Sequence, residues 1–478
     1  MIIIRLLQHL TTYKLVALTF LALILSGTGL LMLPAANVSD ESLSFVDALF
    51  TATSAVCVTG LVVVDTGTYF TTFGQMVVIS LIQLGGLGVM TFATLISVAI
   101  GKKINLRERL LIQEALNQET VSGVVRMVLH IIKYTFLIEF IFGSILAFHF
   151  YPIYGERAVY LGYWHSVSAF CNAGFDLFGN YDSLTKFVGD GVVNFCVMSL
   201  ITLGGLGFIV MDDVLSKRKF KSLTVHSKVV ILASAGLVIA GTVVFRLIEL
   251  NNPDTLANLS YADQWLASMF QAVTPRTAGF NTLPLEKLED SSLFLMVILM
   301  IIGASPASTG GGIKTTTLAV ILMSAWAVLR GRNDIVIFER RISKKAVNKA
   351  FTILVLTLIL ISSVTMVISA IEEMPIILVL FEVASAFGTV GLSAGITRDL
   401  TDTSKLLLIC TMYAGRVGVL TFAMLLLQKP QPATIKYPAV KIIVGSENYH
   451  GREQKTVCCI RYGAFWYKRS EDIVQFRP

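Results

Sequence analysis

Eight long apolar segments restrict what this sequence can fold into. They lie at about 15–34, 73–100, 127–150, 191–212, 228–248, 291–325, 350–370 and 405–427. Each is near or above the roughly 20 residues that a membrane-spanning helix needs. Of the 478 residues, 55% are hydrophobic and only 14% are charged, which is too little charge for the surface of a soluble protein of this size. The sequence therefore predicts an all-α polytopic membrane protein with eight transmembrane spans.

The eight long segments form four consecutive pairs. A shorter, semi-apolar stretch lies between the two members of each pair. These four stretches cover about 44–61, 160–175, 262–280 and 376–392. Their length is typical of re-entrant segments, which enter a membrane and return to the same side. The chain thus divides into four predicted repeats of helix, re-entrant pore loop and helix, with a tail after them. The boundaries are 10–100, 127–213, 227–325 (with a broken last span), 350–428 and, for the tail, 429–478.

The four short stretches align without gaps, which is the strongest sign of an internal repeat. They read "FTATSAVCVTGL", "WHSVSAFCNAGF", "MFQAVTPRTAGF" and "FEVASAFGTVGL". Each ends in a glycine followed by Leu or Phe, and these glycines are Gly60, Gly174, Gly279 and Gly391. The spans that follow also repeat, as "QLGGLGVM", "TLGGLGFI" and "YAGRVGVL". Repeats of this kind predict four equivalent structural units.

The distribution of basic residues predicts the orientation in the membrane. The loops 101–126, 217–228 and 330–349 hold five, five and seven Lys or Arg residues, whereas the loops on the other side hold five in total. Basic loops face the cytoplasm. We therefore expect a multi-pass protein of the plasma membrane with both termini and the tail in the cytoplasm. The net charge of +7 follows from the same loops, so no nucleic-acid partner is expected.

The repeated loop has a clear chemical use. Non-helical backbone is tolerated at membrane depth only where it is buried in protein or lines water, so four such loops around one axis would enclose a single pore. Backbone carbonyl groups lining a pore replace the hydration shell of a cation, and the negative C-terminal ends of the short helices favour a cation there. Glycine allows the close approach of the backbone. A single glycine would more often serve helix packing, but four in register favour a selectivity filter.

The predicted filter consists of each aligned glycine and the two residues before it. Its residues are Val58, Thr59, Gly60, Asn172, Ala173, Gly174, Thr277, Ala278, Gly279, Thr389, Val390 and Gly391. The short helix of the first repeat is expected at about 44–56. Carbonyl chemistry alone indicates a monovalent cation.

The motifs resemble those of the potassium-transporter superfamily that includes the Trk, Ktr and plant HKT proteins, and look most like the Ktr-type ion-translocating membrane subunit. The most specific are "AVCVTGL", "TPRTAGFNT", "GASPASTGGGIKTTT" and "AGRVGVLTF", and the resemblance covers about 10–445. Some HKT proteins that transport sodium have serine at the first filter position, so glycine at all four implies potassium at the filter carbonyls. The resemblance also implies a homodimer and a separate cytoplasmic ring of nucleotide-binding (RCK-type) regulatory subunits. It implies no cofactor in this chain, and leaves sodium open as a stimulating or coupled ion.

Arg416 and the segment 303–317 form the predicted gate. Arg416 takes the place of Gly86 and Gly205 within an apolar span, where a charge is costly and indicates a function. Its alternative role is to bind a carboxylate or helix carbonyl groups. The segment "GASPASTGGGIKTTT" cannot continue a helix easily, and it resembles the family's intramembrane loop. The predicted gate residues are Arg416, Gly303, Ser305, Ser308, Thr309, Gly310, Gly311 and Gly312, with the three hydroxyl groups expected to interact with Arg416 or with a passing ion.

Other polar residues near the filter have two interpretations. Asp65, Asp176 and Asn281 either concentrate cations at the pore mouth or are ordinary loop residues. Arg276 lies in the third filter loop, and we expect it to point away and to pair with a carboxylate such as Glu382.

Lys314 belongs to "GGGIKT", which resembles a nucleotide-binding P-loop but has Ile313 before the lysine where the motif requires glycine. We expect Lys314 to reach the cytoplasmic interface instead.

Three other functions are possible for a chain of this class. A sodium-permeable cation transporter of the same fold is the first, and the four glycines argue against it. A coupled secondary solute carrier is the second, although such carriers usually have two repeats. An intramembrane enzyme is the third, but the sequence shows no catalytic array, so we expect no enzyme activity. Residues 446–478 have no clear period and no resemblance to the superfamily.

Overall fold

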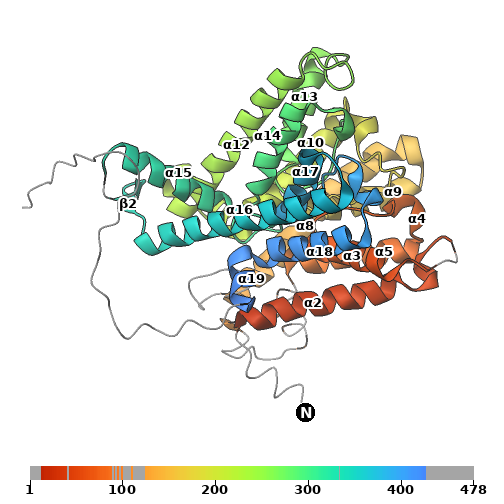
Figure 1. Cartoon of the computed structure of the whole chain (residues 1–478), viewed down its shortest axis with the longest axis horizontal. Coiled ribbons are helices and arrows are strands. Elements are labelled where there is room, and N and C mark those ends of the chain that lie inside the picture. Colours follow the sequence, from red (N-terminus) through yellow and green to blue (C-terminus); the bar gives the residue numbers. More distant parts are fainter. Residues whose placement is uncertain are drawn as a thin grey trace, which may run out of the picture.

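The computed structural model of the chain describes residues 12–39, 42–88, scattered positions from 91 to 113, 124–332 and 334–426. This part is a bundle of α-helices with one two-stranded β-hairpin (Figure 1). The predicted tail at 429–478 and the first residues of the first predicted repeat lie outside it.

Helices follow one another in a recurring order in the described part of the chain. A long helix is followed by a short, buried helix. After it comes a helix of intermediate length, which is called the second helix of the set below. The four sets are α2 (Thr12–Leu31), α3 (Phe45–Cys57) and α5 (Thr72–Leu87); α8 (Val124–Tyr154), α9 (Arg157–Phe170) and α10 (Gly191–Leu206); α12 (Val225–Glu249), α13 (Tyr261–Val273) and α14 (Asp290–Ile301); and α16 (Lys344–Glu372), α17 (Ile376–Gly388) and α18 (Asp402–Val417).

Shorter elements connect these sets or follow them. They are α4 (Thr66–Tyr69), α11 (Phe208–Lys217), α15 (Thr315–Leu329), α19 (Val419–Leu426), the antiparallel strands β1 (Val336–Ile337) and β2 (Arg340–Arg341), and the 3-10 helices η1 (Pro34–Ala36), η2 (Thr185–Phe187), η3 (Phe220–Ser222), η4 (Leu285–Lys287) and η5 (Ile396–Asp399). Helix α15 and the hairpin project from one side of the bundle (Figure 1).

The sets pack on one another in a closed order. The second helix of each set contacts the short helix of the next, so that α5 packs on α9, α10 on α13 and α14 on α17. The last contact is between α18 and α3, which joins the fourth set to the first. There the Nζ atom of Lys405 lies 2.7 Å from a carboxylate oxygen of Asp47. The bundle is therefore circular, with the four short helices inside it.

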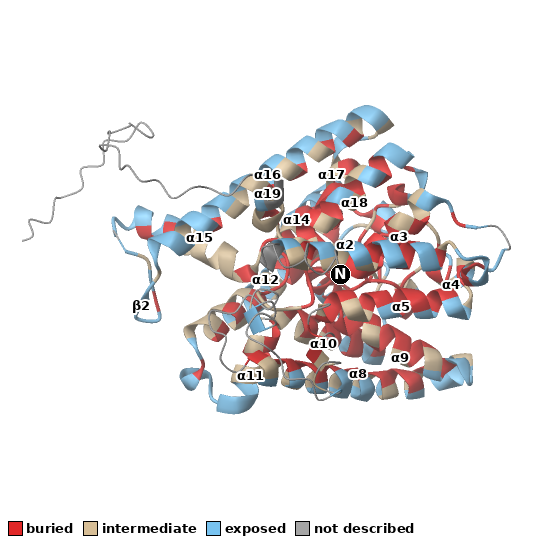
Figure 2. Cartoon of the chain, turned by 90° about the horizontal axis from the view of Figure 1, so that it is seen from below, coloured by how far each residue is buried: buried red, intermediate tan, exposed pale blue. Residues whose placement is uncertain are grey.

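The surface of the bundle is apolar and its interior holds many polar groups. Figure 2 shows buried residues on the inner helices and exposed residues on the long outer ones. The exposed residues include large hydrophobic side chains, such as Phe148 on α8, which is 86% exposed, and Met366 on α16. Hydroxyl and amide groups such as those of Ser54, Asn172 and Thr389 are fully buried. This distribution fits a lipid environment better than water.

Fewer helices than expected are long enough to cross a membrane alone. Among the described residues, α8, α12, α16 and α2 from Lys14 onward satisfy the length and composition, and the bent pair α10 and α11 is a fifth candidate with a 97° bend. The other expected spans are divided into shorter helices. The sequence predicted such a break only in the third repeat, so the breaks in the other repeats were not expected.

Glycines at positive φ explain the additional breaks. Helices α5, α10 and α18 end before Gly88, Gly207 and Gly418, whose φ angles are 85°, 92° and 96°. Glycine adopts this conformation without a Cβ penalty, and a right-handed helix cannot continue through it. The last glycine of "GGLG" in two spans, and of "GRVG" in a third, is therefore a helix end.

A second type of glycine brings three of the four second helices, α5, α10 and α18, against the end of a short helix. A Cβ atom on Gly85, Gly204 or Gly415 would lie only 1.9 to 2.0 Å from a carbonyl oxygen in the last turn of α3, α9 or α17. Real Cβ contacts are never this short, so any side chain there must displace the backbone. These glycines are required for close helix packing.

Replacing Gly204 with alanine should destabilise the fold. Alanine normally stabilises a helix by up to about 1 kcal/mol relative to glycine. At Gly204 the Cβ would lie 1.9 Å from Phe170 O, so we expect the opposite sign and a loss of about 1–3 kcal/mol. The midpoint of thermal unfolding in detergent measures the change. Gly236→Ala on α12 is the matched control, because a Cβ there meets nothing within 4 Å. Equal midpoints for the two variants would contradict the packing argument.

Candidate functional site

The four aligned glycines lie in a closed ring at the centre of the bundle. Each lies against the carbonyl oxygen of the residue that precedes the next glycine, and a Cβ atom on it would meet that oxygen at 2.2 to 2.7 Å. For Gly60, Gly174, Gly279 and Gly391, these oxygens belong to Ala173, Ala278, Val390 and Thr59. The order returns to the first glycine, so the four segments surround one point.

The backbone of these segments adopts an uncommon conformation. The glycines have φ angles between 69° and 95°. The residues two positions earlier are also left-handed, with φ angles of 58° for Val58, 61° for Asn172, 72° for Thr277 and 52° for Thr389. Positive φ is unfavourable for a residue with a side chain, and most unfavourable for the β-branched Val58 and the two threonines. Such strain persists only where the surrounding structure holds it, and it gathers at functional sites.

Serine side chains hold two of the segments from the short helices. Ser54 Oγ accepts a hydrogen bond from Gly60 N at 3.0 Å, and Ser385 Oγ accepts one from Gly391 N at 3.0 Å. Both hydroxyl groups therefore fix the backbone of a ring glycine.

The other two segments are held just after their glycines. Ser168 Oγ donates to Phe175 O at 2.7 Å, and Thr274 Oγ1 donates to Phe280 O. Sequence analysis missed these four side chains. The signal was present, because serine occupies the fifth position in three of the four aligned stretches and threonine the sixth in the other.

A cavity of about 500 Å3 opens above the ring, and all four glycines line it. Its wall includes Asp65, Asp176 and Asn281, the three residues predicted near the mouth. Asp65 also accepts a hydrogen bond from Asn180 N at 3.1 Å, and Asp176 accepts one from Phe178 N at 3.1 Å. These carboxylates both line the cavity and fix its loops, so the two interpretations of them are compatible.

The segment between α14 and α15 lies directly against the other side of the ring segments. Its residue Gly311 donates through its backbone N–H to Thr389 Oγ1 at 3.0 Å. A Cβ on Gly310 would lie 2.1 Å from Thr277 Oγ1, so there is no room for a side chain between them. Thr277 and Thr389 each lie two positions before a ring glycine. The segment therefore covers the side of the ring that these two residues form.

The same segment is folded back on itself and bound to α10. Ile302 and Ile313 form an isolated parallel bridge, and a Cβ on Gly303 would lie 2.2 Å from Gly311 O. Ser305 N donates to Gly205 O at 3.0 Å. The segment is thus a compact loop within the bundle, as its small residues allow.

Arg416 connects this loop to the first set of helices. Its guanidinium group donates to Thr309 O in the loop and to Gly85 O and, at 3.1 Å, Gly86 O at the end of α5. The predicted alternative, binding to carbonyl groups, is therefore its arrangement in this structure. The guanidinium also lies 5.8 Å from the ring centroid of Phe20.

The predicted contacts of the loop hydroxyl groups with Arg416 are not formed. Arg416 binds the carbonyl oxygen of Thr309, whereas the hydroxyl of Ser308 donates to Ser305 O at 2.6 Å. The hydroxyl of Ser305 accepts from Thr315 Oγ1 at 3.0 Å. Carbonyl groups are stronger acceptors for a guanidinium group than a hydroxyl already used within the loop.

Two expectations about other cations were wrong. Lys314 does not extend to the cytoplasmic interface, because its Nζ donates to Gly310 O at 2.7 Å and to Gly311 O at 3.3 Å. Arg276 does point away from the ring, but it donates to Ser234 Oγ at 2.9 Å on α12. Glu382 instead accepts from the nearby hydroxyl groups of Ser393 and Thr397, so that carboxylate is already satisfied.

Asn172 connects the ring segments to one another. Its side-chain amide lies 3.1 Å from Thr277 Oγ1, in the next segment of the ring. The predicted filter residues thus come together in the structure, from four places that are more than 100 residues apart. The predicted gate residues come together directly beside them.

Comparison with known proteins identifies the family. A sequence profile of the TrkH family, described as a cation transport protein, matches residues 7–437. The chain belongs to the TrkH family. Its relatives are integral membrane transporters and not enzymes.

Two similar proteins match this TrkH-family chain over nearly its whole length. The Ktr system potassium uptake protein B of Bacillus subtilis (strain 168) is 43% identical over 436 residues, which are 91% of this chain and 97% of that protein. The potassium/sodium uptake protein NtpJ of Enterococcus hirae is 41% identical over 448 residues, or 92% and 99% of the two proteins.

A solved structure has the same fold as this TrkH-family chain. The crystal structure of the potassium transporter TrkH from Vibrio parahaemolyticus superposes with a TM-score of 0.69. The alignment covers 88% of this chain and 86% of that one, at 17% sequence identity. The likeness therefore concerns the arrangement of the helices.

Removing the hydroxyl group of Ser385 should destabilise the ring. Ser385→Ala leaves the partly buried N–H of Gly391 without its partner, which should lower the free energy of unfolding by about 0.5–1.5 kcal/mol. Thermal unfolding in detergent measures this. Ser363→Ala is the control, because that exposed hydroxyl only donates to Leu360 O within its own helix. A Ser385→Ala protein as stable as the control would argue against this support of the backbone.

Proposed function

We propose that this chain takes up potassium through a single pore whose selectivity filter is the ring of four glycine segments. The proposed pore is surrounded by four repeats of helix, re-entrant loop and helix, with the boundaries predicted from the sequence. The closed order of Gly60, Gly174, Gly279 and Gly391 is the observation that carries the proposal. Four segments that surround one point, with no side chain possible on the glycines, can present backbone carbonyl groups to an ion on the axis.

The short helices add an electrostatic contribution. Helices α3 and α17 end immediately before a filter segment, and α9 and α13 end one and three residues before theirs, so each C-terminal end faces the ring. The helix dipole gives that end a partial negative charge, which stabilises a cation. The acidic residues of the outer cavity, Asp65 and Asp176, would attract cations toward the entrance.

The names of the relatives support potassium as the transported cation. The protein at 43% identity is named for potassium uptake, and the one at 41% for potassium and sodium uptake. Glycine at all four filter positions supports potassium selectivity by resemblance to the superfamily. A sodium-permeable transporter of the same fold is the second candidate, favoured by the name of the second relative. In either case the transported ion is the substrate, and sodium is open as a stimulating or coupled ion.

The loop 303–317 and Arg416 form the proposed gate. The loop packs against Thr277 and Thr389, so an ion that leaves the filter on this side meets it first. Arg416 adds a positive charge beside the path and binds the loop through Thr309 O. Opening requires the loop to move, and breaking the contacts of Arg416 is part of that movement.

Orientation and partners follow from the charge of the loops and from the names of the relatives. The basic loops and both termini would face the cytoplasm in the plasma membrane. The words "Ktr system" in the name of a relative support a complex with other subunits. We infer a homodimer with a ring of nucleotide-binding regulatory subunits docked on the basic loops.

Ion competition tests the filter. In liposomes that hold the purified protein, potassium should inhibit rubidium uptake much more strongly than sodium does. Gly60→Ser adds a side chain that would lie against Ala173 O, and we expect it to reduce the preference for potassium about tenfold, or by about 1.4 kcal/mol.

Gly29→Ser on α2 is the matched control, since a Cβ there meets nothing within 4 Å. Equal inhibition by sodium and potassium in the wild type would favour the sodium-permeable transporter. Rubidium uptake that depends on an organic solute would favour a coupled carrier and contradict the proposal.

Substitution of Arg416 tests the gate. Arg416→Gln removes the charge and the contact with the loop, and lowering the barrier by about 1.4 kcal/mol would raise the rate of rubidium uptake about tenfold. Arg416→Lys keeps the charge and should transport at a rate closer to that of the wild type. If both variants are folded and neither is faster than the wild type, Arg416 is a structural residue and not a barrier.

A further inference from the structure

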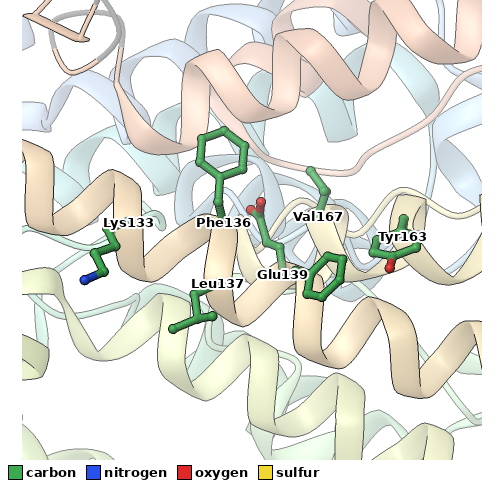
Figure 3. Close-up of a pocket in the computed structure, with 7 residues that line it drawn as sticks. Lys133, Phe136, Leu137, Glu139, Tyr163 and Val167 are labelled. Carbon is green, nitrogen blue, oxygen red and sulfur yellow. The ribbon is translucent and has the colours of Figure 1, made fainter. Parts of the chain in front are cut away.

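A groove lies on the outer face of the bundle, away from the proposed pore. It has a volume of about 650 Å3 and lies between α8 and α9. Figure 3 shows its lining residues: Lys133, Phe136, Leu137, Glu139 and Phe140 from α8, with Tyr163 and Val167 from α9. The mechanism proposed above uses none of them.

The groove is apolar where it meets the surroundings. Phe136, Leu137 and Phe140 are 49%, 50% and 61% exposed. Its only carboxylate, Glu139, is 4% exposed, and both of its oxygens accept from Gln83 Nε2, at 3.0 and 3.1 Å. The hydroxyl of Tyr163 lies 2.8 Å from Ser144 Oγ. The carboxyl group of Glu139 and the hydroxyl group of Tyr163 are therefore occupied by the protein, and the apolar surface between them suits a hydrocarbon chain.

The groove lies at mid-length of α8, a helix that is long and apolar enough to cross a membrane. Helix α8 has 31 residues, and Glu139 lies at its middle. If the hydrocarbon layer of about 30 Å is centred there, Lys133 lies about 6 Å inside its edge, because each residue advances the helix by 1.5 Å. A lysine at that depth extends its amine to the headgroup region while its stem stays in the apolar layer. The groove then runs from the headgroups toward the middle of the bilayer.

The headgroup end of the groove is positively charged. Arg126 and Lys133 are seven residues apart on α8, so they share one face of the helix, and both are exposed. Within the described part of the chain, neither forms an ion pair with a carboxylate. Leu137 and Phe140 continue the same face into the apolar part of the groove. This order, two cations followed by an apolar groove, is complementary to a phosphate followed by an acyl chain.

We propose that the groove binds one anionic phospholipid from the leaflet on the side of Val124. Its phosphate lies at Lys133 and Arg126, and one acyl chain fills the groove between α8 and α9. The site is separate from the ion path. It would nevertheless touch a support of the filter, because Gln83, which binds Glu139, also accepts from Cys171 Sγ at 3.1 Å, and Cys171 precedes Asn172.

Photo-crosslinking with a lipid tests the proposal. The full-length protein is placed in phosphatidylcholine vesicles that contain a small amount of phosphatidylglycerol with a diazirine on one acyl chain, or the same probe with a choline headgroup. After irradiation, mass spectrometry locates the labelled residues. We expect labels on the groove residues of α8 and α9, with the glycerol probe labelling them roughly 25-fold more than the choline probe, the factor expected for two basic residues near the surface at about 1 kcal/mol each.

Two substitutions separate the two ends of the site. Lys133→Gln should reduce the ratio between the probes to about fivefold, because Arg126 remains, and should keep the labelling position. Val167→Trp should narrow the groove between α8 and α9 and reduce its labelling with both probes. Lys349→Gln, which removes an exposed lysine on α16, is the control for lost charge and should leave the ratio unchanged.

Three results would overturn the proposal. These are equal labelling of the groove by both probes in the wild type, labelling spread evenly around the outer helices, and groove residues that are protected from lipid by a second copy of the chain. None of these readouts depends on ion transport, so they are independent of whether the filter proposal holds.

Discussion

The fold depends on four places where the backbone must come closer to its neighbour than any side chain would allow. At each ring glycine, a Cβ atom would lie within 2.7 Å of the next segment's carbonyl oxygen. The short helices, the loops and the strained residues before each glycine are arranged so that these approaches occur together. If one segment moved outward, the contact with both neighbours would be lost. The glycines therefore act as a closed set and not as four separate turns.

Two kinds of support hold this set. Hydroxyl groups on the short helices bind the backbone at or just after the ring glycines, as Ser54 does for Gly60. Glycines in the second helices, such as Gly204, allow those helices to pack tightly on the ends of the short ones. The strained conformation of residues such as Val58 can be maintained because both supports are buried and directional. Stability and the shape of the site thus come from the same contacts.

Sequence alone predicted the family, the helical membrane class and the residues that meet at the ring, because a fourfold repeat with glycines in register leaves few alternatives. It predicted the broken span of the third repeat but not the breaks in the other repeats, since the glycines of "GGLG" resemble packing glycines until their φ angles are known. It also missed Ser385 and its counterparts, although the alignment contained them. The partners of Arg276 and Lys314 could not be predicted, because several acceptors lie within reach of a long side chain and only the packing selects among them.

The loop between α14 and α15 has a consequence for the architecture as a whole. It occupies the space against Thr277 and Thr389, close to the common axis, and it comes from one quarter of the chain only. A pore built from four identical subunits would carry four such loops, and they would collide in that space. Joining the quarters in one polypeptide removes this restriction, because each quarter can diverge by itself. The asymmetry of a single chain is therefore what allows one loop and one arginine to lie beside a ring of four segments.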